Sequence, residues 1–542
     1  MLRRAKDERR RAEGVRRTAS AGLLVAVGTG VGNVLAYGFN LVLSRGLGPG
    51  GYAELGTLLS VFLIGSVPGM AVQAVNARRL AVAADAPSAV RGELVRALRR
   101  RGLLVGVGVA AVFAALAPAV AALLPSVTVG GVAWTGVSLA ANTVFASYLG
   151  IAQGTSRFVT MTALYLAAHS TRLAIGAAAA STLVSPTTVM AAQTAAWALA
   201  AGIGRLLLRD EARIDAAASQ QEARVGEVAG RQEQVTVAAG RGGSVTEVAG
   251  SYAYVGEGAG RSEPAAEGVG GHHEQVAVGA EWQVGAAAGS QAEDGGAGGG
   301  GAAVGRVAGV GGRGVGGGGA GYLAEVLRAA GGLGGILLLT VLDTLLASRY
   351  LVGEDLGRYN TGGLIARAAF FAPSFVAMLA YPRLARAEER RRALTVSLVL
   401  TGGIGVVGVG LAAVGGNPLI GVAFGSEYAS GGGFDLGGHG WLFAAVGALL
   451  ALVNLALLDG VARRSHAVSV VVLGGIAVEA GIIVGFAHSS PAEIVTAAAA
   501  SALVTASASV AVCLSARAVP EVAAVAAGEA IRITAAPDAA RL

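Results

Sequence analysis

The stretch SRGLGPGGY, residues 44–52, lies between two long apolar runs and combines one arginine with four glycines and one proline. Glycine accepts positive φ angles and proline fixes its own φ, so this density of both residues predicts a tight turn. Each flanking run is about 20 residues long, which is the length an α-helix needs to cross a bilayer. We therefore predict two membrane-spanning helices that reverse direction at Gly48–Gly51.

The rest of the chain has the same apolar character. Its 542 residues are 54% hydrophobic and 14% charged, with a mean hydropathy of +0.62. Soluble proteins carry about 25% charged residues, so we expect a polytopic all-α membrane protein. Lys6 is the only lysine, which excludes a P-loop. Cys513 is the only cysteine, which excludes an internal disulfide and a cysteine metal site. We expect no metal and no cofactor.

Twelve apolar runs predict twelve transmembrane helices. They cover residues 20–44, 52–76, 102–124, 129–152, 159–182, 186–208, 325–348, 358–381, 393–415, 438–458, 467–488 and 492–515. Arginines cluster in alternate loops, near residues 78–101, 157, 383–392 and 463–464, whereas the other loops offer only Arg45, Arg349 and Arg358. Cytoplasmic loops are enriched in basic residues, so we place both termini in the cytoplasm. Membrane topology explains the net charge of +7 better than nucleic-acid binding does.

Residues 210–322 differ from the rest in composition. They are rich in glycine, alanine, glutamate and glutamine, and they hold 14 acids against 7 arginines. A segment of this kind cannot bury enough apolar surface to fold, so we predict a disordered cytoplasmic insert. The pair His272–His273 lies within it, but HHEQV does not complete the HExxH zinc motif.

The insert separates two predicted six-helix lobes, residues 20–209 and 323–515, which a basic N-terminus (1–19) and a tail (516–542) flank. The pattern Ser44-Arg45-x-Leu47 recurs 304 residues later as Ser348-Arg349-x-Leu351, and Arg79-Leu80-Ala81 recurs at the same offset as Arg383-Leu384-Ala385. Because each half has six spans, an even number, both lobes begin on the cytoplasmic side. We therefore predict a parallel repeat about an axis along the membrane normal, with a cavity between the lobes.

Four segments resemble the polysaccharide biosynthesis proteins of the multidrug/oligosaccharidyl-lipid/polysaccharide exporter superfamily, which include the flippases for O-antigen, capsule and teichuronic-type glycans. They are LSRGLGPGGYAELGTLLSVFLIGSVPGMAVQAVNARRLA (43–81), SYLGIAQGTSRF (147–158), LDTLLASRYLVGEDLGRYNTGGLIARAAFFAPSFVAMLAYPRLA (342–385) and FGSEYA (424–429). The resemblance covers nearly the whole chain apart from the insert. It implies two six-helix bundles that open alternately to each side of the membrane. It also implies the transport of an undecaprenyl-linked oligosaccharide between leaflets, without enzymatic activity.

A lipid-linked sugar carries a pyrophosphate, and four arginines are candidates to bind it. Charges inside spans are costly and usually face a cavity. Arg172 lies about 14 residues into the fifth span, roughly 21 Å from the inner surface, and Arg367 lies roughly 14 Å from the outer surface. Arg45 and Arg349 end the first and seventh spans on the outside. The alternative for these last two is that they only extend to the membrane interface.

Two acids within spans are candidates for ion coupling. Asp343 in the seventh span and Glu479 near the middle of the eleventh could take up a proton or Na⁺. Asn40 lies near the repeat position of Asp343. The alternative for Asp343 is an ion pair with Arg367 that only fixes the packing of neighbouring helices. We interpret His169, one turn before Arg172, as a polar packing residue rather than a proton relay.

Three other functions compete with the flippase. A drug/cation antiporter of the same superfamily would need more acids within the spans than Asp343 and Glu479. A membrane-bound glycosyltransferase or polymerase would need catalytic groups outside, but the largest outer loop (416–437) holds only Glu427 and Asp435, without a DxD motif. A scaffold would use the insert to bind partners. We expect a monomer in the bacterial cytoplasmic membrane, in contact with membrane lipids.

Overall fold

The structure is a computed structural model, and its described residues are 2–182, 185–209, 319–373, 389–430, 433–463 and 465–515, together with Val376, Ala380 and Leu384. For residues 2–26 it describes the backbone alone. Residues 210–318 of the predicted insert, with the pair His272–His273, lie outside the described residues, and so do Arg383, Ala385 and the predicted tail.

Helices form the framework, and the described ranges contain no strand. The first half holds α1 (Leu2–Gly65), α2 (Val67–Val82), α3 (Ser88–Leu123), α4 (Val129–Gly154), α5 (Phe158–Thr182) and α6 (Pro186–Leu207). The second half holds α9 (Gly319–Leu339), α10 (Leu342–Tyr350), α11 (Gly353–Phe371), α13 (Arg390–Phe424), α14 (Ser426–Ser430), α15 (Leu436–Ala462), α16 (Ala467–Gly485) and α17 (Pro491–Ser515). Within the described residues a helix lies at each of the twelve predicted spans, and 8 helical segments are long and apolar enough to cross a membrane. The chain is a multi-pass membrane protein of the predicted class.

The turn in residues 44–52 involves fewer residues than the sequence predicts. Only Gly48 departs from helical geometry, with a φ of 65°, a value that glycine adopts at low cost. Pro49 follows as the first residue of the next helix, where a missing N–H leaves no hydrogen bond unmade. The chain still reverses, because Tyr52 Oη donates to Asn40 Oδ1 at 3.4 Å. In a straight helix these residues would be about 18 Å apart.

The predicted seventh span is two helices rather than one. α9 ends at Leu339 and α10 begins at Leu342, with Val341 at a non-helical φ of −137° and ψ of 2°. Residues 336–344, around the break, include neither proline nor glycine. Instead, Thr340 Oγ1 donates to the carbonyl oxygen of Leu337 at 2.7 Å, and side-chain bonds of this kind bend helices. The break places Asp343 in the first turn of α10.

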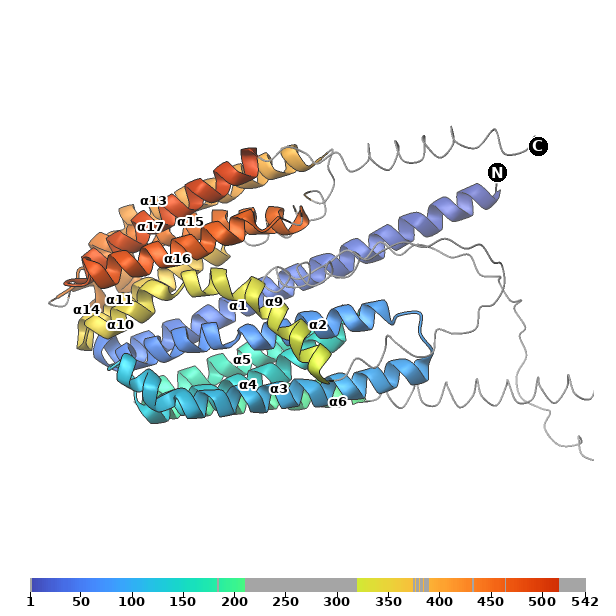
Figure 1. Ribbon diagram of the computed structural model, residues 1–542, viewed down its shortest axis with the longest axis horizontal. Coiled ribbons are helices and arrows are strands. Elements are labelled where there is room, and N and C mark those ends of the chain that lie inside the picture. Colours follow the sequence, from blue (N-terminus) through green and yellow to red (C-terminus); the bar gives the residue numbers. More distant parts are fainter. Residues whose placement is uncertain are drawn as a thin grey trace, which may run out of the picture.

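The helices form two lobes, which we call the N-lobe (α1–α6) and the C-lobe (α9–α17). In Figure 1 the blue-to-green and the yellow-to-red helices lie on opposite sides of the molecule, and α9 crosses from one group towards the other. Each lobe contains an equivalent hydrogen bond from a tyrosine hydroxyl. Tyr52 bonds to Asn40 in the N-lobe, and Tyr359 Oη donates to Asp343 Oδ2 at 2.9 Å in the C-lobe. This recurrence supports the predicted parallel repeat.

The lobes contact each other closely at the end where the Gly48 turn lies, which we call the outer end. A Cβ atom on Gly357 of α11 would collide with the carbonyl oxygen of Pro49, so only glycine permits this approach. One turn further along α11, Asn360 Nδ2 donates to the carbonyl oxygen of Ala53 at 2.7 Å. The outer end is therefore a tight, hydrogen-bonded contact between α1 and α11.

At the opposite, inner end, α9 bridges to α2. Arg79 of α2 donates from Nε and Nη2 to one carboxylate oxygen, Oε2 of Glu325 on α9, at 2.9 and 2.7 Å. Tyr322 Oη donates to Asn76 Oδ1 at 3.0 Å beside this pair. These bonds join the lobes at the arginine-rich end of the molecule, which the sequence predicts to be cytoplasmic.

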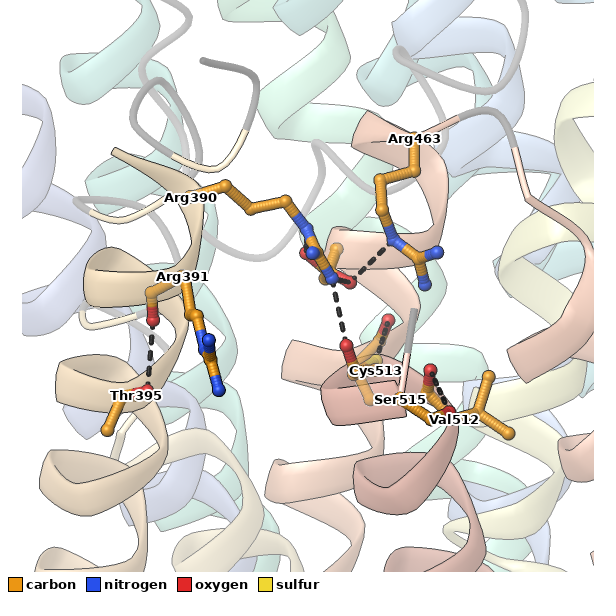
Figure 2. A network of polar contacts seen from close by, with 9 residues as sticks. Arg390, Arg391, Thr395, Arg463, Val512, Cys513 and Ser515 are labelled. Atoms are coloured by element: carbon orange, nitrogen blue, oxygen red, sulfur yellow. Dashed lines mark hydrogen bonds and ion pairs between the residues drawn. The ribbon is translucent and has the colours of Figure 1, made fainter. Parts of the chain in front are cut away.

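A buried ion cluster joins three C-lobe helices at the inner end. Asp459 of α15 is fully buried and accepts two hydrogen bonds from Arg390 of α13, at 2.7 and 2.8 Å. Arg463 donates to the same carboxylate at 2.9 Å. Figure 2 shows the guanidinium groups of Arg390 and Arg463 converging, with a further bond from Arg390 to the carbonyl oxygen of Cys513 on α17. The cluster therefore fixes the inner ends of α13, α15 and α17.

Replacing Asp459 by alanine should lower the free energy of unfolding by about 3–5 kcal/mol, because it removes the buried carboxylate to which Arg390 and Arg463 both donate. Denaturant unfolding of the purified protein in detergent measures this loss. Asp85→Ala is the matched control, since Asp85 is exposed in the turn between α2 and α3. A loss of less than about 1 kcal/mol, the usual range for surface ion pairs, would contradict the assignment.

Candidate functional site: a polar cavity between the lobes

A cavity of about 550 Å³ lies between the lobes. Helices α1, α2, α4, α5 and α6 form its N-lobe wall, and α9 and α11 close it from the C-lobe. Its volume lies within the range of about 300–1,000 Å³ that is typical of small-molecule sites. Its polar and aromatic lining residues are Thr29, Asn33, Tyr37, Asn40, Phe62, Ser66, Gln73, Asn142, Phe145, Tyr165, His169, Arg172, Trp197, Arg367 and Phe371.

Arg172 of α5 is the buried cation of the N-lobe wall. Its Nη2 donates to Gln193 Oε1 at 2.9 Å, and Gln193 in turn donates to Ser138 Oγ at 3.3 Å. The guanidinium group also lies over the rings of Phe39 and Trp197, at 4.5 and 5.0 Å from their centroids. Aromatic faces attract cations. The side chain is thus held at the cavity wall by one amide and two rings, without an acidic partner among the described residues.

Three buried nitrogen atoms at this wall have no hydrogen-bond partner in the described part of the chain. They are Arg172 Nε, His169 Nδ1 and Trp197 Nε1. The Arg172 and Trp197 atoms can only donate, and the His169 atom donates or accepts according to its tautomer. An unsatisfied buried donor costs about 1–3 kcal/mol. Because the three atoms are buried, a bound group rich in acceptor oxygens would offset this cost only after these side chains turn towards the cavity.

Arg367 of α11 lines the cavity from the C-lobe. Its Nη2 donates to Ser60 Oγ at 3.2 Å, and its Nε donates to the carbonyl oxygen of Gly363 at 3.1 Å. The structure thus brings Arg172 and Arg367 to one cavity from opposite lobes. Arginine supplies all the formal charge among its described lining residues, which include no Asp or Glu.

The two ion-coupling candidates, Asp343 and Glu479, come together in the C-lobe. Both are buried, at 4% and 3% exposure, and Glu479 of α16 faces the backbone of Asp343 closely enough for their charges to interact. Asp343 accepts hydrogen bonds from Tyr359 and, at 3.3 Å, from Thr344. No hydrogen bond or ion pair joins Asp343 to Arg367, although both side chains are described. No group of three or more His, Cys, Asp or Glu in the described residues could hold a metal ion.

The other two candidate arginines lie outside the cavity. Arg45 and Arg349 are exposed at the outer end, one in each lobe. Arg349 Nη1 lies 3.4 Å from the carbonyl oxygens of Ala122 and Leu123, where α3 ends. The structure therefore separates the four candidates into an inner pair that lines the cavity and an outer pair that does not.

The sequence interpretation missed Trp197 and Gln193 as parts of the site. α6 begins with an N-cap at Ser185, whose hydroxyl accepts from the Thr188 N–H, followed by Pro186. Trp197 lies 11 residues after Pro186, or about 16 Å along the helix. Tryptophan is enriched at membrane interfaces rather than at this depth. The unusual depth of Trp197 in its span could therefore have identified it as a site residue from the sequence. The sequence offers no such indication for Gln193, because one amide in a span is compatible with packing alone.

The fold resembles solved MATE transporters of the MOP superfamily. A eukaryotic MATE transporter aligns with a TM-score of 0.52 at 10% identity, over 94% of this chain and 96% of its own. A multidrug resistance MATE transporter in an inward-facing conformation gives 0.54 at 10% identity, over 88% and 94%. One in an outward-facing conformation gives 0.51 at 12%, over 91% and 94%. The chain has the fold of this class of membrane transporters.

Sequence comparison adds nothing to this structural likeness, since no protein-family model and no curated protein matches the chain.

Proposed function

We propose that the chain is an alternating-access transporter that moves a lipid-linked oligosaccharide across the bacterial cytoplasmic membrane for cell-surface polysaccharide synthesis. One observation carries the proposal: the charged residues that line the central cavity are Arg172 and Arg367, accompanied by unpartnered hydrogen-bond donors. Such a wall suits a substrate that is anionic and rich in oxygen.

The chemistry of a pyrophosphate-linked sugar matches this lining. A guanidinium group offers a fixed fork of donors that fits phosphate oxygens and keeps its charge at any cellular pH. Asn33, Gln73 and Asn142 present amides that can bond to sugar hydroxyls. Because Arg172 and Arg367 belong to different lobes, a phosphate between them would pull the lobes together. Substrate binding would then favour one conformation of the transporter.

The buried carboxyl pair supports coupling to a proton or Na⁺. Burial of two carboxylates in one low-dielectric region costs less free energy when a proton or Na⁺ neutralises their charge. Asp343 also lies in the first turn of α10, beside the break from α9. Discontinuous helices of this kind form ion sites in other transporters. We infer that uptake of an ion by Asp343 and Glu479 shifts the break and thereby moves the lobes.

The second candidate is a drug/cation antiporter of the same superfamily. The carboxyl pair favours it, since exchange for protons or Na⁺ would use the same groups, and the aromatic lining would accommodate a flat apolar drug. The two cavity arginines oppose it, because they repel an organic cation in the space where it would bind.

Reconstitution into liposomes distinguishes the two candidates. Vesicles contain an undecaprenyl-pyrophosphate oligosaccharide that carries a fluorophore on its sugar, and a membrane-impermeant reductant bleaches the outer leaflet. We expect the protein to expose the label of the inner leaflet as well, and we expect no ethidium transport by the same vesicles under a proton or Na⁺ gradient. Ethidium transport without oligosaccharide transport would replace the flippase by the antiporter.

A further inference from the structure

A second hollow lies between the lobes towards the outer end, on the other side of α1 from the central cavity. Its volume is about 470 Å³. Helices α1 and α3 of the N-lobe and α10 and α16 of the C-lobe form its wall. Val61 and Ile64 of α1 face this groove, whereas Leu59, Phe62 and Leu63 of the same helix line the cavity. One helix therefore separates a polar cavity from an apolar groove.

The groove is lined almost entirely by hydrocarbon. Apart from Arg349 and Tyr350, its lining residues are Val61, Ile64, Phe113, Leu116, Val120, Leu123, Leu124, Leu345, Leu346 and Val484. Several of them are half-exposed at its rim: Leu116 is 51% exposed, Leu123 63% and Val484 52%. In a membrane-spanning protein, such side chains at this depth face lipid chains. The groove is thus open sideways to the hydrocarbon of the bilayer.

A cation lies at the end of this groove. Arg349 is exposed, and its contacts with the carbonyl oxygens of Ala122 and Leu123 involve Nη1 alone and are long, at 3.4 Å. Its other guanidinium N–H groups have no partner among the described residues. Beside it, Tyr350 stacks on His488 with a centroid distance of 4.5 Å. Amphipathic aromatic rings are typical of the level of lipid headgroups.

We propose that this groove binds one hydrocarbon chain of a phosphate-bearing membrane lipid whose phosphate pairs with Arg349. The apolar wall matches the chain, and the guanidinium group at its end matches the phosphate. Because the wall comes from both lobes, the bound lipid contacts both and resists their separation at this side. The groove would bind this lipid whichever substrate the central cavity transports.

Photo-crosslinking tests this site on the full-length protein in nanodiscs. The probe is phosphatidylglycerol with a diazirine in one acyl chain, and peptide mass spectrometry locates the adducts. We expect more adducts on Val61, Ile64 and Leu345 in the groove than on Val406 and Val407, which lie on the exposed face of α13. Arg349→Gln should lower the groove adducts about fivefold, since a basic residue near the surface contributes about 1 kcal/mol to phosphate attraction. A diazirine diacylglycerol, which lacks the phosphate, should be unaffected by this variant.

Arg45→Gln is the matched control, because Arg45 is the repeat counterpart of Arg349 and does not line the groove. It should leave the adducts unchanged, whereas Leu345→Trp, which fills the groove, should remove them while those at Val406 persist. Equal labelling of the groove and of α13 would show ordinary surrounding lipid only and overturn the proposal. Groove labelling that is unchanged by Arg349→Gln would overturn the pairing with phosphate.

Discussion

An Arg172→Gln variant should transport the lipid-linked oligosaccharide at least tenfold more slowly than the natural chain. A charge-assisted hydrogen bond is worth about 1.5–3 kcal/mol, and each 1.36 kcal/mol corresponds to about a factor of ten in rate. The variant should unfold at the same temperature or a higher one. Arg172 is buried without an acidic partner among the described residues, and such burial costs free energy. The liposome assay and thermal unfolding separate lost transport from lost folding.

The chain supplies its own control for this prediction. Arg45→Gln removes the same charge at the outer end, outside the cavity, and should leave the transport rate unchanged. Arg367→Gln should behave like Arg172→Gln, because it removes the cation from the opposite wall. Normal transport by both cavity variants would refute the role of the two arginines in substrate binding.

An Asp343→Asn variant should lose the stimulation of transport by an imposed proton or Na⁺ gradient, so that its rate falls to the value measured without a gradient. Asparagine can still accept the hydrogen bond from Tyr359, so the geometry of α10 should persist. It can neither take up a proton nor neutralise Na⁺. Thermal unfolding should be unchanged or shifted upwards, because the repulsion between Asp343 and Glu479 disappears.

Glu479→Gln should have the same effect as Asp343→Asn, since either change removes one of the two carboxyl groups that we propose take up the ion. Asp355→Asn is the control. Its carboxylate belongs to the same lobe but is 44% exposed at the outer end. Full gradient dependence in the Asp343 and Glu479 variants would exclude the carboxyl pair from coupling and leave it a packing role.

The sequence predicts the class of fold because hydrophobic length and loop charge report directly on membrane crossing. The sequence pattern also predicts a helix at each of the twelve spans, and the structure has one there. It further predicts the repeat, which the corresponding hydrogen bonds of Tyr52 and Tyr359 support. It did not predict the break between α9 and α10. That break uses neither glycine nor proline, and a single threonine hydroxyl that bonds to the backbone has no distinct sequence signal.

The candidate site was predictable only in part. Charges within spans are rare and costly, so Arg172, Arg367, Asp343 and Glu479 could be selected from the sequence. Which of these residues lie close together could not be predicted, because this depends on how each helix is rotated about its axis in the packed bundle. The structure places Arg172 and Arg367 at the cavity, and it brings Asp343 and Glu479 together in the C-lobe.

The most direct test of the proposed function is a binding titration read at Trp197, which lies against Arg172 at the cavity wall. A variant in which the other three tryptophans, Trp134, Trp282 and Trp441, are replaced by phenylalanine reports from the cavity alone. We expect undecaprenyl pyrophosphate to change the Trp197 emission saturably, Arg172→Gln to abolish the change, and ethidium to cause none. Saturable binding of ethidium together with no response to undecaprenyl pyrophosphate would contradict an anionic substrate in this cavity.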